Sequence, residues 1–278
     1  FSYQNKTYYA DADGALLRNG WRQVNGNWYC FRSYNLVTNE FVKQGSRYGY
    51  VDSTGKYTTG WVIVNDSQNL VRYINPDKKG YVTNESKWIN GKKYYFDKNG
   101  YRINDLTNIY KGPYTFEVDR VNGVMTVYAD SARTIPVKTI RVSVGNPWTP
   151  TPKGKYTLTP YSRWQALMGP SWGQYGTHVN GAGQGGIFVH SVACSYANSY
   201  NLPVSAYNKL GSPASHGCIR TCVGDAKWVY YNSSGSTIYI FDGTYNSNES
   251  FKGPLGRRAI VPARWKNGGY YDPTDPAA

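Results

Sequence analysis

Residues 114–128 read YTFEVDRVNGVMTVY, two runs of alternating residues on either side of Asn122-Gly123. Alternation with a period of two is typical of strands, and an Asn-Gly pair between such runs is the strongest short-range signal for a β-hairpin. The stretch therefore predicts that a β-rich domain opens here with a hairpin.

Downstream of this hairpin, strands and turns follow one another without a crossover helix. One helix is predicted over Val223–Asn232, where apolar residues recur at helical spacing. Residues 243–278 are expected to form an extended C-terminal tail. A turn is expected at Thr151–Gly154, with further strands at Ile140–Val144, Lys155–Thr159 and Thr237–Phe241.

The first hundred residues contain a repeat in which an aromatic cluster precedes Asp-x-x-Gly. Its four copies carry Asp11, Asp52, Asp77 and Asp97. Each copy predicts a short aromatic strand, a turn whose Gly adopts positive φ, and a returning strand. A lone hairpin is marginal in water, so the copies are expected to stack through their aromatic residues. These residues either form only this shared core or also line grooves that stack on sugars or hold a cation.

Composition shifts after Asn104-Asp105, and the Asp-x-x-Gly units end near Lys111. This shift predicts three parts: hairpin repeats at 1–107, a second domain at 108–242 and the tail at 243–278. The chain is expected to be mainly β throughout.

The chain has 278 residues, and 31 Lys and Arg against 17 Asp and Glu give it a formal net charge of +14. This excess predicts attraction to a polyanion: nucleic acid, an anionic membrane face or an anionic cell wall. The basic residues are scattered over both domains without a basic run, which argues against nucleic acid. No run approaches the ~20 apolar residues of a membrane span, so an integral membrane protein is excluded. Because the chain begins at Phe1, we expect a processed or trimmed piece.

The segment Gly211–Arg220, GSPASHGCIR, places Cys218 directly ahead of the predicted helix. A helix N-terminus favours the thiolate, and Gly217 allows a substrate carbonyl to approach the backbone. Upstream, the apolar run at 185–191 delivers His190, a suitable base for a thiol. A Cys and a His brought together in space indicate acyl transfer.

Together, Gly185-x-Ile187-x-x-His190-Ser191 and Ser215-His216-Gly217-Cys218-Ile219-Arg220 resemble the active-site signature of the L,D-transpeptidases, bacterial enzymes that crosslink peptidoglycan. The likeness to this YkuD-like catalytic domain extends over residues 114–242. It implies a β-sandwich with one short helix after the catalytic Cys.

The resemblance assigns roles to individual residues. Cys218 is the nucleophile, and His190 is the general base and acid, with its other ring nitrogen held by the carbonyl of Ser191. The N–H groups of Gly217 and Cys218, with His216 nearby, stabilise the oxyanion. Arg220 either binds a substrate carboxylate through its bidentate fork or forms a structural salt bridge.

Further residues are expected around the substrate. Ser215 is placed at the substrate site, and Trp164 and Tyr175 lie where family members carry a mobile flap, although plain packing is the alternative. The segment between His190 and Ser215 is longer than the common family spacing, so a loop at Cys194–Gly211 is expected to overhang the cleft.

Cys194 and Cys222 follow the base and the nucleophile by four residues each. They either form a disulfide that braces the cleft or remain two buried thiols, while Cys30 stays single. No C-x-x-C or H-x-x-x-H spacing occurs, so no metal or other cofactor is expected.

Residues 1–107 resemble the cell-wall-binding repeats related to choline-binding modules, through Gly20-Trp21 and Trp28-Tyr29-Cys30-Phe31. The pattern departs after Gly60-Trp61, where Val71-Arg72-Tyr73 replaces the aromatic triplet. A full set of choline cages is therefore not expected, whereas attachment to an anionic wall polymer or glycan is.

These resemblances imply an enzyme that forms a Cys thioester with a peptidoglycan stem peptide, releases terminal D-Ala, and crosslinks the stem or attaches a wall partner. The alternatives are a hydrolase that trims stem peptides with the same residues, and a wall-binding protein without catalysis. The expected location is extracellular and wall-associated, of the Gram-positive type, with the chain acting as a monomer.

Overall fold

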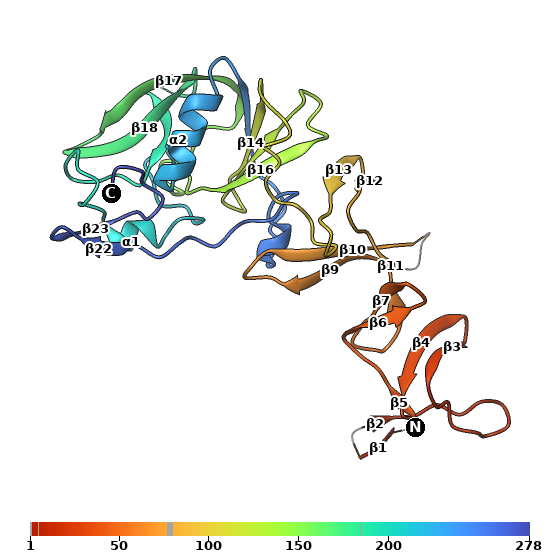
Figure 1. Ribbon diagram of the computed structural model, residues 1–278. Helices are drawn as coiled ribbons and strands as arrows, with labels where there is room; N and C mark the ends of the chain where they lie inside the picture. Colours follow the sequence, from red (N-terminus) through yellow and green to blue (C-terminus); the bar gives the residue numbers. More distant parts are fainter. Residues whose placement is uncertain (1, 5, 77–79, 184) are drawn as a thin grey trace. The chain divides into compact units, whose positions relative to one another are not determined.

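A computed structural model describes residues 2–4, 6–76, 80–183 and 185–278 and divides the chain into two compact units (Figure 1). The first unit comprises Phe1–Val64, Leu70–Ser86 and Tyr95–Arg102. The second comprises Asn65–Asn69, Lys87–Tyr94 and Ile103–Ala278. The chain enters the second unit for the last time at Ile103.

The repeat region is built from hairpins, three of which add a short third strand. Their strands are β1 (Ser2–Tyr3) and β2 (Lys6–Thr7); β3 (Gly20–Val24), β4 (Asn27–Arg32) and β5 (Asn35–Leu36); β6 (Glu40–Gln44), β7 (Arg47–Val51) and β8 (Tyr57–Thr58); β9 (Gly60–Asn65), β10 (Leu70–Asn75) and β11 (Gly80–Tyr81); and β12 (Ser86–Ile89) and β13 (Lys92–Tyr95).

The Asp-x-x-Gly segments form one recurring turn. In the copies at Asp11, Asp52 and Asp97, the carboxylate accepts hydrogen bonds from the backbone N–H groups two and four residues later. The Gly of each copy has a φ of 79° to 82°, which confirms the predicted left-handed glycine. Each turn leads into the short third strand or a single bridge, whereas the tight reversals of the long strands lie elsewhere, as at Gly26. Asp77 lies outside the described residues.

Aromatic contacts join neighbouring hairpins, as expected. Trp21 meets Tyr57 edge-on with ring centroids 5.7 Å apart, and Trp61 stacks on Phe96 at 5.9 Å. Small apolar side chains fill the space beneath Trp21, namely Cys30, Val37, Val42 and Val51. Buried aromatic and aliphatic area of this kind stabilises hairpins that would not persist alone.

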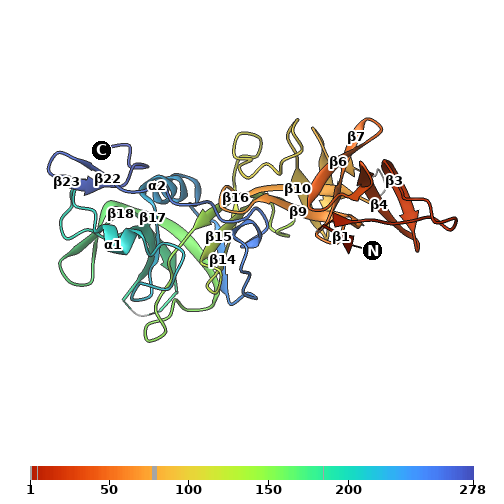
Figure 2. The same cartoon turned by 90° about the horizontal axis from the view of Figure 1, so that it is seen from below.

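The second unit is organised around one eight-stranded sheet in the order β16-β15-β14-β21-β17-β18-β19-β20 (Figures 1 and 2). Its strands are hydrogen-bonded neighbours in one large sheet, and the chain is mainly β as predicted. They are β14 (Thr115–Asp119), β15 (Val124–Tyr128), β16 (Pro136–Arg141), β17 (Gly154–Leu167), β18 (Ser171–Asn180), β19 (Ile187–Ser191), β20 (Ile219–Thr221) and β21 (Thr237–Phe241).

Most of the helix and strands predicted for this unit are present in the structure. The hairpin around Asn122-Gly123 is β14 and β15, the predicted helix is α2 (Val223–Asn232), and β21 has the expected bounds. The strand expected at Ile140–Val144 begins earlier, as β16, and ends at Arg141. The one-turn helix α1 (Val204–Tyr207) was not predicted, because it is too short to show helical periodicity.

Residues 243–278, expected as an extended tail, contain only the short 3₁₀ helix η1 (Glu249–Phe251) and the hairpin β22 (Arg264–Lys266) and β23 (Gly269–Tyr271). Their polar side chains nevertheless join the second unit. Asp272 accepts the N–H of Val223 at 2.6 Å, and Thr274 accepts that of Gly224 at 2.8 Å. These two residues satisfy the free N–H groups at the start of α2, which the side chain of its N-cap residue does not cap.

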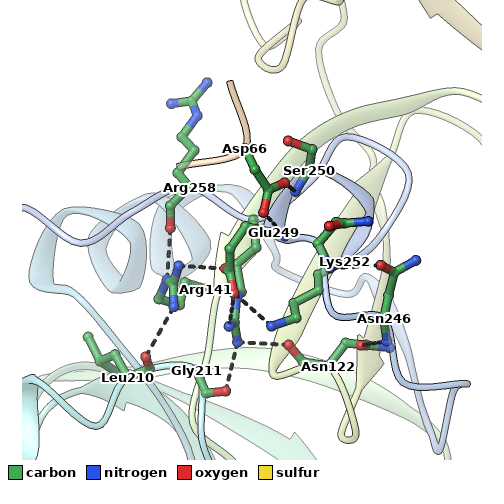
Figure 3. Close-up of polar contacts among 12 residues, drawn as sticks. Asp66, Asn122, Arg141, Leu210, Gly211, Asn246, Glu249, Ser250, Lys252 and Arg258 are labelled. Atoms are coloured by element: carbon green, nitrogen blue, oxygen red, sulfur yellow. Dashed lines mark hydrogen bonds and ion pairs between the residues drawn. The ribbon is translucent and has the colours of Figure 1, made fainter. Parts of the chain in front are cut away.

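Glu249 is the centre of a charge network that fastens this segment (Figure 3). Its carboxylate accepts hydrogen bonds from Arg141, Lys252 and Arg257 at 2.6–2.8 Å. Arg257 in turn donates to the carbonyl of Gly211 at 2.7 Å. Burial alone would raise the pKa of Glu249, but the hydrogen bonds and charges of these cations lower it to about 2.

We expect Glu249→Gln to lower the free energy of unfolding by ~2 kcal/mol or more, because three cations lose their shared counter-charge. The folded-state pKa is depressed, so the stabilisation is present above pH 4.5 and is lost as pH falls towards 2. Urea unfolding followed by fluorescence should show that the difference in free energy of unfolding between wild type and Glu249→Gln becomes smaller as pH falls from 4.5 towards 2.

Glu40→Gln is the matched control, because Glu40 pairs with Arg32 in an exposed salt bridge whose side chains are 44% and 62% accessible. Its effect should stay within ~0.5 kcal/mol. Equal losses for the two variants would contradict the importance of the Glu249 network.

Candidate active site

A cavity of about 400 Å³ in the second unit collects four of the predicted site residues. These are His190, His216, Cys218 and Arg220. The rest of the lining comes from the long β17–β18 hairpin, from β19 and from the segment before it, namely Tyr161, Gln165, Ala166, Leu167, Met168, Ser171, Gly185, Gly186 and Phe188.

The strand register explains why residues far apart in the sequence meet here. Strand β20 pairs in parallel with β19, and Arg220 lies directly opposite His190. Side chains at paired positions stand on the same face of a sheet, and residues two apart on an extended chain share a face. The side chain of Cys218, two residues before Arg220, is therefore delivered to the same face as the imidazole.

His190 is completely buried, and its ring is oriented by the backbone. Nδ1 lies 2.5 Å from the carbonyl oxygen of Ser191. A carbonyl can only accept, so Nδ1 carries the hydrogen and Nε2 is left as the acceptor. Among the described residues, Nε2 has no hydrogen-bond partner. Burial, and then the charge of Arg220, lower the pKa of His190 to about 4, so the imidazole is neutral at pH 7.

The thiol of Cys218 does not have the electrostatic setting that the sequence predicted. Helix α2 starts only at Val223, and β20 separates it from the thiol, so the helix dipole does not act directly on the sulfur. Burial raises the pKa of Cys218, while a backbone hydrogen bond at Phe188 and the charge of Arg220 oppose the rise. The resting site therefore holds a protonated thiol and a neutral imidazole in one cavity.

The loop before Cys218 is held in one shape by buried hydrogen bonds. Ser215 Oγ accepts the N–H of Gly217 at 3.2 Å and donates to the carbonyl of Cys218. Thr151 Oγ1 donates to the carbonyl of Gly217 at 2.7 Å. Gly217 has a φ of 114°, and a Cβ there would lie 2.9 Å from Ile187, so only glycine fits. Ser215 engages the Gly217 N–H that was expected to face an oxyanion.

Arg220 lies in the cavity with spare hydrogen-bonding capacity. Its Nη1 donates to the carbonyl of Ala214 at 3.1 Å, while its Nε is buried without a partner. No carboxylate within the described ranges forms an ion pair with it, so the structural salt bridge considered above is not seen. A buried guanidinium with an unsatisfied donor is suited to an anionic ligand.

Three predicted substrate residues do not line the cavity. Ser215 is fully buried within the loop. Tyr175 is 5% exposed and packs against Tyr230 of α2, while Trp164 lies beside Arg163. The loop at Cys194–Gly211 was expected to overhang the cleft. It instead buries Leu202, Tyr207 and Leu210 against Val192 and the C-terminal segment.

Sequence reasoning missed several residues that shape the site. Gly173 on β18 leaves room for His190, since a Cβ there would collide with Nδ1. Thr151 was identified only as part of a turn. Tyr161 and Phe188, whose rings lie 5.8 Å apart, contribute aromatic lining. No sequence pattern singled out Gly173 or Tyr161, because only the pairing of β17, β18 and β19 shows which residues face the cavity.

The four cysteines are all free thiols. Of the two alternatives for Cys194 and Cys222, the structure therefore has separate thiols. Burial, and then nearby aspartates, raise the pKa of both, to about 12 for Cys194. Within the part of the chain that the structure describes, no three His, Cys, Asp or Glu side chains cluster as metal ligands.

Comparison with protein families matches both units. Residues 113–240 match the family model of the "L,D-transpeptidase catalytic domain". Residues 19–31 and 87–102 match that of the "Putative cell wall binding repeat". The chain thus carries an L,D-transpeptidase-type domain preceded by wall-binding repeats, which confirms both resemblances.

Individual relatives are more distant, and the chain covers only part of each of them. "Putative L,D-transpeptidase YciB" of Bacillus subtilis is 34% identical over 83 residues, which are 30% of this chain and 41% of that protein. "Toxin A" of Clostridium novyi is 25% identical over 108 residues, 37% of this chain and 5% of the toxin. An L,D-transpeptidase structure from Mycobacterium smegmatis is 23% identical with a TM-score of 0.36, covering 46% of this chain and 58% of that one. The chain thus spans well under two thirds of these curated relatives.

None of the helices in the described ranges has the length and apolar character needed to cross a membrane.

The protonation states of the site lead to a test with a thiol reagent. Because the thiolate is the reactive form, alkylation of Cys218 by iodoacetamide should be slow at pH 7 and rise about tenfold per pH unit towards pH 9 and beyond. His190→Gln should leave this profile unchanged, since no imidazolium is present to stabilise the thiolate. Peptide mapping by mass spectrometry would measure each site. A rate independent of pH between 5 and 8 that is lost in His190→Gln would reveal a preformed ion pair instead.

Proposed function

We propose that the chain is a wall-associated cysteine L,D-transpeptidase that forms a thioester on Cys218 and transfers a stem peptide to an amine. The single observation that supports this best is the shared cavity. It brings together a thiol, an imidazole whose Nε2 has no partner among the described residues, and a guanidinium with a spare donor. Nucleophile, base and anion-binding group are the parts that acyl transfer from a peptide with a terminal carboxylate requires.

In the proposed first half-reaction, Nε2 of His190 takes the proton from Cys218 as Sγ attacks the carbonyl carbon of the residue before terminal D-Ala. The C–S bond forms and the carbonyl oxygen becomes an oxyanion. Since Ser215 engages Gly217 N–H, we assign stabilisation of this charge to Cys218 N–H and His216, each such donor contributing ~3 kcal/mol. The C–N bond then breaks, His190 returns the proton to the departing nitrogen, and D-Ala leaves.

In the second half-reaction an amine attacks the thioester while His190 accepts its proton. The C–S bond breaks, the sulfur recovers the proton, and a new peptide bond joins two stems or a stem and a wall partner. Water in place of the amine would give the hydrolase. A low pKa for His190 suits both halves, because the imidazole is unprotonated whenever it must act as a base.

The repeats supply the second part of the proposal. Hairpins stacked through aromatic residues, together with the net charge of +14, suit attachment to an anionic wall polymer or glycan. Such attachment would raise the local concentration of stem peptides around the cavity. We propose an extracellular location on a Gram-positive-type wall and, since all the catalytic groups come from one chain, action as a monomer.

Intact mass spectrometry tests the reaction. Incubation with a disaccharide-tetrapeptide should give an acyl adduct on the protein and, with a second stem as acceptor, a crosslinked dimer. Cys218→Ala should abolish both products, and His190→Gln should slow adduct formation by ~10² or more, because the general base is lost. Cys30→Ala, which removes a buried thiol of the first unit, should leave both products unchanged.

A tripeptide product without any dimer would favour the hydrolase. The absence of adduct and product with stems of every diamino acid, from folded protein, would leave a wall-binding protein without catalysis.

A second test concerns Arg220. Arg220→Lys should raise KM for a tetrapeptide stem about tenfold, because Lys lacks the bidentate fork for a carboxylate. A stem whose terminal carboxylate is amidated should respond less. Arg163 does not line the cavity, so Arg163→Lys should leave KM unchanged for both the acid and the amidated stem. Equal effects of Arg220→Lys on the acid and the amide would show that Arg220 does not bind that carboxylate.

A further inference from the structure

The first unit contains an arrangement of three aromatic rings around a cation. The guanidinium carbon of Arg72, on β10, lies 4.3 Å from the ring centroid of Tyr81, 4.5 Å from that of Tyr101 and 4.7 Å from that of Phe41. All four residues belong to the first unit. A cation within ~6 Å of a ring centroid is attracted by the ring quadrupole, and aromatic cages recognise methylated ammonium groups in this way.

The guanidinium is held by ring faces more than by polar partners. Its Nε is buried without a hydrogen bond among the described residues, and no carboxylate within them forms an ion pair with Arg72. By contrast, Arg18 lies over one ring, that of Tyr34, at 5.7 Å. Arg72 therefore has the surroundings of a bound organic cation.

Packing alone does not explain why a charged side chain occupies position 72. Placing a cation in a half-buried site costs desolvation, which an apolar side chain of similar length would avoid. The pairing of Ile74 with Tyr81 in β10 and β11 corresponds to that of Phe31 with Leu36 in β4 and β5. Two residues before Ile74 and Phe31, Arg72 takes the place of Tyr29, an aromatic residue. A cation thus stands where the other hairpin contributes a ring.

We propose that Phe41, Tyr81 and Tyr101 form a binding site for a small organic cation that Arg72 fills from within the chain. The intact protein then does not take quaternary ammonium ligands at this site, and removing the Arg72 side chain opens it to them. Attachment of the repeats to the wall would then not depend on a quaternary ammonium ligand at this site. This inference concerns the ligand of the repeats and is independent of the reaction proposed at Cys218.

Thermal unfolding of the full chain with tetramethylammonium chloride tests the proposal, with sodium chloride at equal ionic strength as reference. Wild-type Tm should be the same in both salts. Arg72→Ala should lower Tm, and tetramethylammonium should restore several degrees of it, because a ligand that binds only the folded state stabilises that state. If Arg72→Ala is unfolded without additive, tetramethylammonium should restore its folded circular dichroism spectrum.

Two control variants make the test specific. Arg72→Met fills the same space without a charge, so it should show no response to tetramethylammonium. Arg18→Ala removes a cation from a single ring and should show none either. The proposal is overturned if wild type and Arg72→Ala respond equally, if Arg72→Met responds as Arg72→Ala does, or if Arg72→Ala gains no stability at 100-fold molar excess or above, up to about 0.1 M. Adduct formation at Cys218 should be unchanged in the folded variants, which separates this result from the catalytic test.

Discussion

The parallel pairing of β19 with β20 is the constraint on which the candidate active site depends. It joins two short strands that are distant in sequence, and its register sets His190 against Arg220 and Ser191 against Thr221. A slip of one residue would turn Cys218 and Arg220 to the opposite face of the sheet. The hydrogen bonds of Ser215 and Thr151 hold the preceding loop, so that the thiol enters the strand in the required register.

The same pairing determines the electrostatics of the site. Because Arg220 is the direct neighbour of His190, its charge adds to burial in keeping the imidazole neutral. The thiol, also buried, keeps its proton. A thiolate–imidazolium pair would place two charges in this buried environment before any substrate is present, at a cost in desolvation free energy. Proton transfer during the attack avoids that charged resting state. The cavity therefore fits the general-base mechanism proposed above, in which Arg220 also binds the substrate carboxylate.

The sequence predicted local features better than their arrangement. The hairpin at Asn122-Gly123 and the helix at Val223–Asn232 follow from turn chemistry and periodicity, which act over a few residues. The nearness of Cys218 to His190 came from a motif and not from the physics of the chain. Tyr175 shows why orientation escaped prediction, because it was expected at a flap over the site, whereas in the structure it lies on β18. Only the pairing of β17 with β18, which contains an irregularity, turns it towards α2.

The repeats illustrate how one composition can serve two purposes. Aromatic rings that bury each other stabilise the hairpins, and the faces left over can bind a cation. Arg72 interrupts the aromatic pattern at Val71-Arg72-Tyr73, and in sequence this looks like decay of the repeat. In the structure the guanidinium lies among three rings, so the interruption supplies a cation to the site from within the chain. A departure from a repeat can therefore change what the repeat binds while leaving its hairpin fold intact.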